Sequence, residues 1–98
     1  QRRDTLCEQL TKYFAKTATW NIPTGGLAIW VQFQPKISLV KLAEEAQKID
    51  LFLPKVVLYQ NKNTCAIRLG FGHLNEDEIA PVIKKLKSAY NKVAMKSF

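Results

Sequence analysis

Residues 64–72 (TCAIRLGFG) constrain the fold of this chain most, because their apolar residues alternate with period two. Successive side chains of a β-strand point to opposite faces, so one face of this segment is an apolar packing surface. Its members are Cys65, Ile67, Leu69 and Phe71. The other face carries one long cation, Arg68, between Ala66 and Gly70. These small neighbours leave room for a planar anion to reach the guanidinium.

Spacing alone leaves two interpretations of Arg68. Most surface arginines bind no ligand, so Arg68 can be a solvated side chain on the open face of a sheet. Alternatively, its rigid fork binds a carboxylate through two parallel hydrogen bonds. The pattern within residues 64–72 does not decide between the two.

The segment from Leu27 to Phe33 is a second predicted strand, in which odd-numbered residues form the apolar face. Trp30 therefore lies on the less apolar face. Large aromatic side chains mostly serve burial, so we expect Trp30 to pack against a neighbouring helix rather than to border a site. The preceding Gly25-Gly26 pair indicates a turn or a close backbone approach, and it lacks the spacing of a phosphate loop.

Three segments show the apolar repeat of amphipathic helices. They run from Arg3 to about Thr17, from Leu39 to about Ile49, and from Glu76 to about Ala94. On the polar face of the second segment, residues four apart form two oppositely charged pairs, Lys41 with Glu45 and Glu44 with Lys48.

Capping residues define the starts of two of these helices. Ser38 is a predicted N-cap of the second. Asn75 is one for the third, and Glu78 completes a capping-box pattern with it. Pro81 removes a backbone hydrogen bond beyond the first turn, so it predicts a late start or a kink in the third helix.

The remaining segments are predicted to be extended or turned. Leu51–Leu53 and Val56–Tyr59 are short strands, residues 60–63 (QNKN) form a polar turn, and Trp20 to Pro23 is an extended lead-in. The order of elements predicts an α/β (α+β) fold, a two-layer sandwich of a small, mostly antiparallel sheet with helices on one face. If the helices cover the Cys65 face, we expect another domain or subunit to lie over Arg68.

Length and composition bound the class of protein. Residues 1–98 are expected to form a single domain, and no apolar run approaches the ~20 residues that cross a bilayer. There is no signal segment, so we expect a cytoplasmic protein. The net charge of +7 is scattered and has no interleaved stacking aromatics, which argues against nucleic-acid binding by these residues. The start QRRD, without Met, suggests a fragment of a longer protein.

No catalytic, cofactor-binding or metal-binding set is predicted within the chain. His73 has no Cys or carboxylate at metal-ligand spacing, and Asp77 and Glu78 are explained by helix capping. Cys7 and Cys65 lack metal-ligand spacing too; reduced thiols are the simplest interpretation, and a disulfide between them stays open.

An ordered set of five segments carries a family resemblance. They are RRDTL, PTGGLAIWVQF, SLVKLAEEAQKIDLFLP, AIRLGFG and LNEDEIAPVIKKL. In this order they resemble the C-terminal small domain of fold type I pyridoxal-phosphate (PLP)-dependent aminotransferases. More narrowly, RRDTL, GGLAIW and IRLGFGHLNEDEI are similar to the aminotransferase-like effector domain of MocR-type transcription regulators of the GntR family.

The resemblance implies a role for Arg68. In the family, the arginine of the matching strand pairs with the carboxylate of the amino-acid substrate or effector. The implied function is part of the effector domain of a GntR/MocR-type regulator, and the alternative is the small domain of a genuine class I/II aminotransferase. The fragment itself is not expected to be an enzyme, whereas the full-length protein can be one.

The resemblance also implies that the cofactor-binding residues lie outside this chain. The Schiff-base lysine, the aspartate that pairs with the pyridine nitrogen and the phosphate-binding residues belong to the family's large domain. PLP is thus expected in the full-length protein and not in the fragment. The implied partners are that large domain, an amino-acid-like ligand, DNA through an N-terminal winged-helix domain, and a second copy in a homodimer. The family usually has a glycine within the stretch that reads QKID here, residues 47–50.

Overall fold

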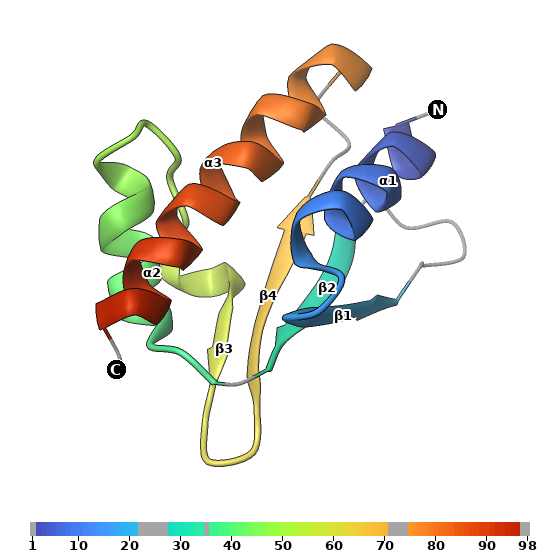
Figure 1. Ribbon diagram of the computed structural model, residues 1–98. Helices are drawn as coiled ribbons and strands as arrows, with labels where there is room; N and C mark the ends of the chain where they lie inside the picture. The colour runs from blue at the N-terminus through green and yellow to red at the C-terminus, as the bar shows by residue number, and fades with distance from the viewer. Residues whose placement is uncertain (1, 22–27, 35, 71–74, 97–98) are drawn as a thin grey trace.

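Helices pack on one face of an antiparallel sheet in the computed structural model (Figure 1), which describes residues 2–21, 28–34, 36–70 and 75–96. The helices are α1 (Arg2–Phe14), α2 (Leu39–Gln47) and α3 (Glu76–Lys96), with a short 3₁₀ helix η1 (Lys55–Val57). The strands are β1 (Ala18–Asn21), β2 (Ala28–Phe33), β3 (Leu58–Gln60) and β4 (Cys65–Gly70). Within the described residues, this arrangement confirms the predicted two-layer fold.

The strands of the described sheet lie in the order β1-β2-β4-β3, and every neighbouring pair is antiparallel. In the central pair, Val31 faces Ile67 and Trp30 faces Arg68. Since side chains alternate between the faces, these two pairs lie on opposite faces. Ile29, Val31, Phe33 and Ile67 are almost completely buried, so theirs is the face beneath the helices.

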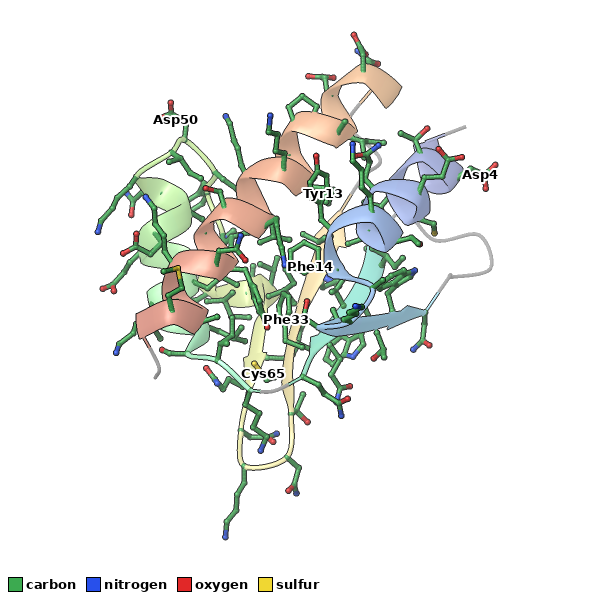
Figure 2. The ribbon with its side chains drawn as sticks, in the orientation of Figure 1. Asp4, Tyr13, Phe14, Phe33, Asp50 and Cys65 are labelled. Atoms are coloured by element: carbon green, nitrogen blue, oxygen red, sulfur yellow. The ribbon has the colours of Figure 1, made fainter. Side chains whose placement is uncertain are left out.

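An aromatic cluster joins the first and last helices to the sheet. Phe14 of α1 lies 5.8 Å from Phe33 of β2 and 5.6 Å from Tyr90 of α3, between ring centroids. Phe33 and Tyr90 stack at 5.3 Å. Figure 2 shows Phe14 and Phe33 between the helices and the sheet. The aromatic contacts therefore fix α1 and α3 side by side over β2.

Helix α2 begins as predicted, but its charged pairs differ from the prediction. The Lys41 N–H donates to Ser38 Oγ at 3.3 Å, which confirms Ser38 as the N-cap. Glu45, expected on the wet face, is 7% exposed, and its carboxylate lies 3.0 Å from Lys48 Nζ. Lys48 therefore pairs with Glu45, three residues before it, rather than with Glu44. The face of α2 that packs on α3 is wide enough to include position 45, which the apolar repeat alone does not show.

Helix α3 begins at Glu76, so the expected late start is wrong. The Asn75 N–H donates to Glu78 Oε1 at 2.9 Å, which is one half of the predicted capping box. Pro81 lies inside the helix, and α3 continues through it (Figure 1). Pro81 is exposed, as is Asp77, whose carbonyl would have accepted the missing bond, so water can satisfy that carbonyl.

The predicted strand at residues 51–53 is wrong, and the predicted strand from Val56 to Tyr59 is confirmed only in part. Val56 and Val57 belong to η1, whereas Leu58 and Tyr59 belong to β3. In the described part of the chain β3 is an edge strand of the sheet, and residues 51–53 do not pair with it. Leu53 is buried through its side chain instead. The lead-in after α1 is a true strand, β1, because it pairs with β2. The predictions for Gly25, Gly26, Phe71 and His73 lie outside the described residues.

Asp50 ends α2 in a left-handed conformation, with φ of 66°. The Leu51 N–H donates to the Ala46 carbonyl at 2.9 Å and the Asp50 N–H to the Gln47 carbonyl at 3.2 Å. These two bonds form a Schellman motif, whose left-handed position is usually glycine. The QKID stretch thus forms the turn with a residue that has a Cβ and is strained there. Figure 2 shows Asp50 at the outer tip of this turn.

Replacement of Asp50 tests this strain. Asp50→Gly is expected to raise the free energy of unfolding by about 0.5–1 kcal/mol, because glycine adopts positive φ without a steric penalty. Asp50→Ala is the matched control, since it removes the same carboxylate but keeps the Cβ, and it should give no gain. Urea unfolding measures both. An equal gain in the two variants would mean that the carboxylate, and not the backbone, is the source of the effect.

Candidate functional site

Arg68 projects from the face of the sheet opposite the helices. It is exposed, and its position in β4 pairs with Trp30 of β2. In the next row along the same face, Ala28 pairs with Gly70. The side chains next to Arg68 on that side are therefore only a methyl group and a hydrogen atom. The structure therefore places the cation where the alternation of residues 65–70 predicted it, with access from solvent.

Two aromatic rings lie on the same face beside Arg68. The Trp30 and Tyr59 ring centroids are 4.8 Å apart, and the planes are inclined at 49°. Ala66 faces Tyr59 across the β3–β4 pair and is completely buried, although it lies on the open face. The expectation that Trp30 packs against a helix is wrong, because the helices occupy the other face and Tyr59 of β3 supplies the contact.

A hollow of about 530 Å³ adjoins Arg68 at the end of β4. Ala28, Arg68 and Gly70 line it from the sheet, and Phe52 and Val57 line it from the segment before β3. The volume falls within the range of about 300–1,000 Å³ that ligand sites occupy. Arg68 is the one charged side chain among its described lining residues. The hollow thus combines an apolar wall with a single cation.

These lining residues do not fit PLP by themselves. Those that the structure describes include no lysine to form a Schiff base, and Arg68 is their one group able to pair with a phosphate or a carboxylate. The described lining residues therefore supply no group that could bond covalently to PLP. Among the described residues, no three His, Cys, Asp or Glu side chains are grouped as a metal site. Nor is any described helix both long and apolar enough to span a membrane.

The sequence patterns did not predict the contribution of Tyr59 and of residues 51–57 to this site. A signal for Tyr59 exists in the polar stretch QNKN, residues 60–63, which forms the turn before β4. The Asn61 N–H closes this turn by donating to the Thr64 carbonyl at 2.9 Å. That turn sets the β3–β4 register and so brings Tyr59 opposite Ala66. Residues 51–57 reach the hollow because of the path from α2 to β3, for which no local pattern exists.

At the other end of β4, Gln60 and Cys65 hold the chain that enters α2. Gln60 Nε2 donates to the Ile37 carbonyl at 2.6 Å, and the Leu39 N–H donates to Gln60 Oε1 at 2.8 Å. The Cys65 thiol donates to the same Ile37 carbonyl at 3.3 Å. Burial raises the pKa of this thiol, and the Ile37 backbone and the charge of Lys36 offset only part of that effect. Neither Cys65 nor Cys7 forms a disulfide, which settles the pairing that the sequence left open.

No protein-family model matches the chain. The uncharacterized HTH-type transcriptional regulator YisV of Bacillus subtilis is 26% identical over 97% of this chain and 20% of the regulator. An uncharacterized aminotransferase of Saccharolobus solfataricus is 30% identical over 88% of this chain and 22% of that protein. The chain thus spans about a fifth of the length of the curated relatives it matches.

Solved structures that match this fold include aminotransferases. The kynurenine aminotransferase of Pyrococcus horikoshii is 30% identical, with a TM-score of 0.77 over 93% of this chain and 23% of that one. The α-aminoadipate aminotransferase LysN of Thermus thermophilus is 17% identical, with a TM-score of 0.79 over 96% of this chain and 25% of that one. Here too the matching part is a minor share of a larger protein.

The Trp30–Tyr59 contact can be tested with a double-mutant cycle. Trp30→Ala and Tyr59→Ala, alone and combined, are expected to show a coupling energy of about 0.5–1.5 kcal/mol in urea unfolding. The matched control is Trp20→Ala with Tyr59→Ala, because Trp20 packs against the core instead. That pair should be additive. A coupling energy near zero for Trp30 and Tyr59 would contradict a stabilising ring contact on the open face.

The Cys65 thiol should be protected from modification in the folded protein. In a Cys7→Ser variant at pH 8, Ellman's reagent should react with Cys65 at least about tenfold more slowly than after unfolding in urea, because the thiolate is the nucleophile and its formation is disfavoured. Absorbance at the wavelength of the released product measures the rate. Equal rates before and after unfolding would mean that the thiol is accessible and ionised in the native state.

Proposed function

Since this chain matches the C-terminal small domain of aminotransferase-like proteins, we propose that it contributes Arg68 to the ligand site of the aminotransferase-like effector domain of a GntR/MocR-type regulator. Arg68 binds the carboxylate of an amino-acid ligand. The observation that carries the proposal is the exposed guanidinium on the sheet face opposite the helices, next to a hollow of ligand size.

The chemistry of this site suits a carboxylate. An arginine fork donates two parallel hydrogen bonds to a carboxylate, and a charge-assisted pair of this kind fixes the orientation of a small ligand. Gly70 and Ala28, which pair across the adjacent row, leave room for such an approach. No short hydrogen bond or ion pair of the described residues is found at the Arg68 guanidinium.

The rest of the site belongs, in this proposal, to a missing large domain that covers the open face. The curated relatives are about five times as long as this chain, which supports a larger full-length protein. PLP would be held by that larger part; LysN was solved with a phosphopyridoxyl-leucine compound and the Pyrococcus enzyme with PMP.

DNA binding through an N-terminal winged-helix domain and assembly as a homodimer are further parts of the proposal. Bacillus relatives described as HTH-type regulators support the first of these.

The alternative is a genuine PLP-dependent aminotransferase, in which Arg68 has the same role. It is supported by 30% identity to the Saccharolobus aminotransferase and to the Pyrococcus enzyme. Two assays on the full-length protein separate the functions: keto-acid formation from amino acids with 2-oxoglutarate, and gel-shift binding to the DNA upstream of its own gene. DNA binding without turnover favours the regulator, and turnover without DNA binding favours the enzyme.

The role of Arg68 itself is tested by removing each half of the proposed pair. In the PLP-loaded full-length protein, Arg68→Lys and Arg68→Gln should weaken L-leucine binding by about tenfold or more in calorimetry. Isoamylamine, which is leucine without its carboxylate, should bind the wild type and both variants alike. Lys62→Gln removes an exposed cation from the turn between β3 and β4 and should change nothing.

This test does not require turnover, since calorimetry detects ligand binding in a protein that catalyses no reaction. If Arg68→Gln bound L-leucine as tightly as the wild type, the proposed role of Arg68 would be refuted for that ligand. If isoamylamine lost as much affinity as L-leucine in the variants, Arg68 would support the shape of the site and would not bind the carboxylate.

A further inference from the structure

The lining of the hollow beside Arg68 bears on which amino acids it can accept. Apart from Arg68, the lining residues that the structure describes are aliphatic, aromatic, proline or glycine. They come from the sheet, from the segment 51–57 and from Val82 of α3. The apolar wall is therefore built by three separate parts of the fold around a single cation.

One cation can pair with one carboxylate. A second carboxylate placed against this wall would lose part of its hydration without gaining a charged partner among the described lining residues, and such desolvation of an unpaired charge is disfavoured. An apolar side chain at the same place would instead gain the free energy of burial, about 1.5–3 kcal/mol when it is fully covered. The difference between the two cases decides in favour of apolar ligands.

Phe52 strengthens this argument, because it is a large apolar side chain that the described fold leaves in solvent. It is 74% exposed although it lines the hollow, whereas its neighbour Leu53 is buried. Phe52 is thus not used by the core of this domain. A ligand with an apolar side chain, seated between Arg68 and Phe52, would cover it.

We propose that the site around Arg68 selects amino acids with an apolar side chain and one carboxylate, and rejects dicarboxylic amino acids. This inference rests on the proposed role of Arg68 as the carboxylate-binding group. Phe52 and Val57 are its specificity-determining residues, because both line the hollow from the segment before β3.

Calorimetry on the full-length protein tests the selection with four probes, L-phenylalanine, L-leucine, L-aspartate and L-glutamate. The wild type should bind the first two at least about tenfold more tightly than the last two. Phe52→Arg places a second cation at the rim of the hollow. It should tighten L-aspartate and L-glutamate at least about threefold and weaken L-phenylalanine.

Val40→Arg is the matched control, since Val40 is 63% exposed on α2 and does not line the hollow. It adds the same charge and should leave all four affinities unchanged. Thermal melts of both variants check folding. Should Phe52→Arg unfold, the affinity ratio of the wild type and the milder Phe52→Ala variant still decide. Loss of the ring should weaken L-phenylalanine and L-leucine and leave L-aspartate and L-glutamate unchanged.

Failure of this inference differs from failure of the proposed function. If L-aspartate bound as tightly as L-phenylalanine and both depended on Arg68, the apolar selection would be wrong and the role of Arg68 would stand. If no probe bound, or if binding were unaffected by Arg68→Gln, the proposed function would be wrong, and the selection argued from it would be withdrawn too.

Discussion

The burial of one face of the sheet beneath α1, α2 and α3 governs the placement of every other group in this domain. Val31 and Ile67 face each other in the two central strands and are completely buried. Because side chains alternate, Trp30 and Arg68 must then lie on the opposite face. A one-residue slip of β4 would place Arg68 under the helices, where an unpaired charge is strongly disfavoured.

The outer side chains of the same strands divide the open face into two parts. Towards β3, the Trp30 and Tyr59 rings cover the surface and bury Ala66. Towards the end of β4, the small residues Ala28 and Gly70 do not fill the surface, and they line the hollow beside Arg68. The contrast between bulky and small residues on these strands, together with the segment 51–57 and Val82 of α3, thus shapes the hollow beside Arg68.

The helical layer is held by contacts that leave the open face untouched. Phe14, Phe33 and Tyr90 join α1, β2 and α3, and Lys87 Nζ lies 5.2 Å from the rings of both Phe14 and Tyr90. Burial raises the pKa of the Tyr90 hydroxyl, while the Thr17 side chain beside it acts in the opposite direction. Since the buried core lies in this layer, replacement of an exposed side chain on the open face such as Arg68 leaves the core contacts intact.

The sequence by itself determined the elements with a strong period and the face on which Arg68 lies. Apolar repeats defined the helices, the N-cap at Ser38 and the capping pair of Asn75 and Glu78 defined two helix starts, and the alternation of residues 65–70 assigned the faces of β4. All of these depend on residues within about one turn or one strand of each other, so a local pattern is sufficient to predict them.

Only the tertiary structure decided what meets Arg68 across the sheet. The Trp30–Tyr59 contact, the strand β1 and the approach of residues 51–57 all depend on segments that are distant in sequence or on a pairing partner. The burial of Glu45 likewise depends on how closely α2 packs on α3. Such contacts follow from which surfaces remain available once the core has formed, and no single segment contains that information.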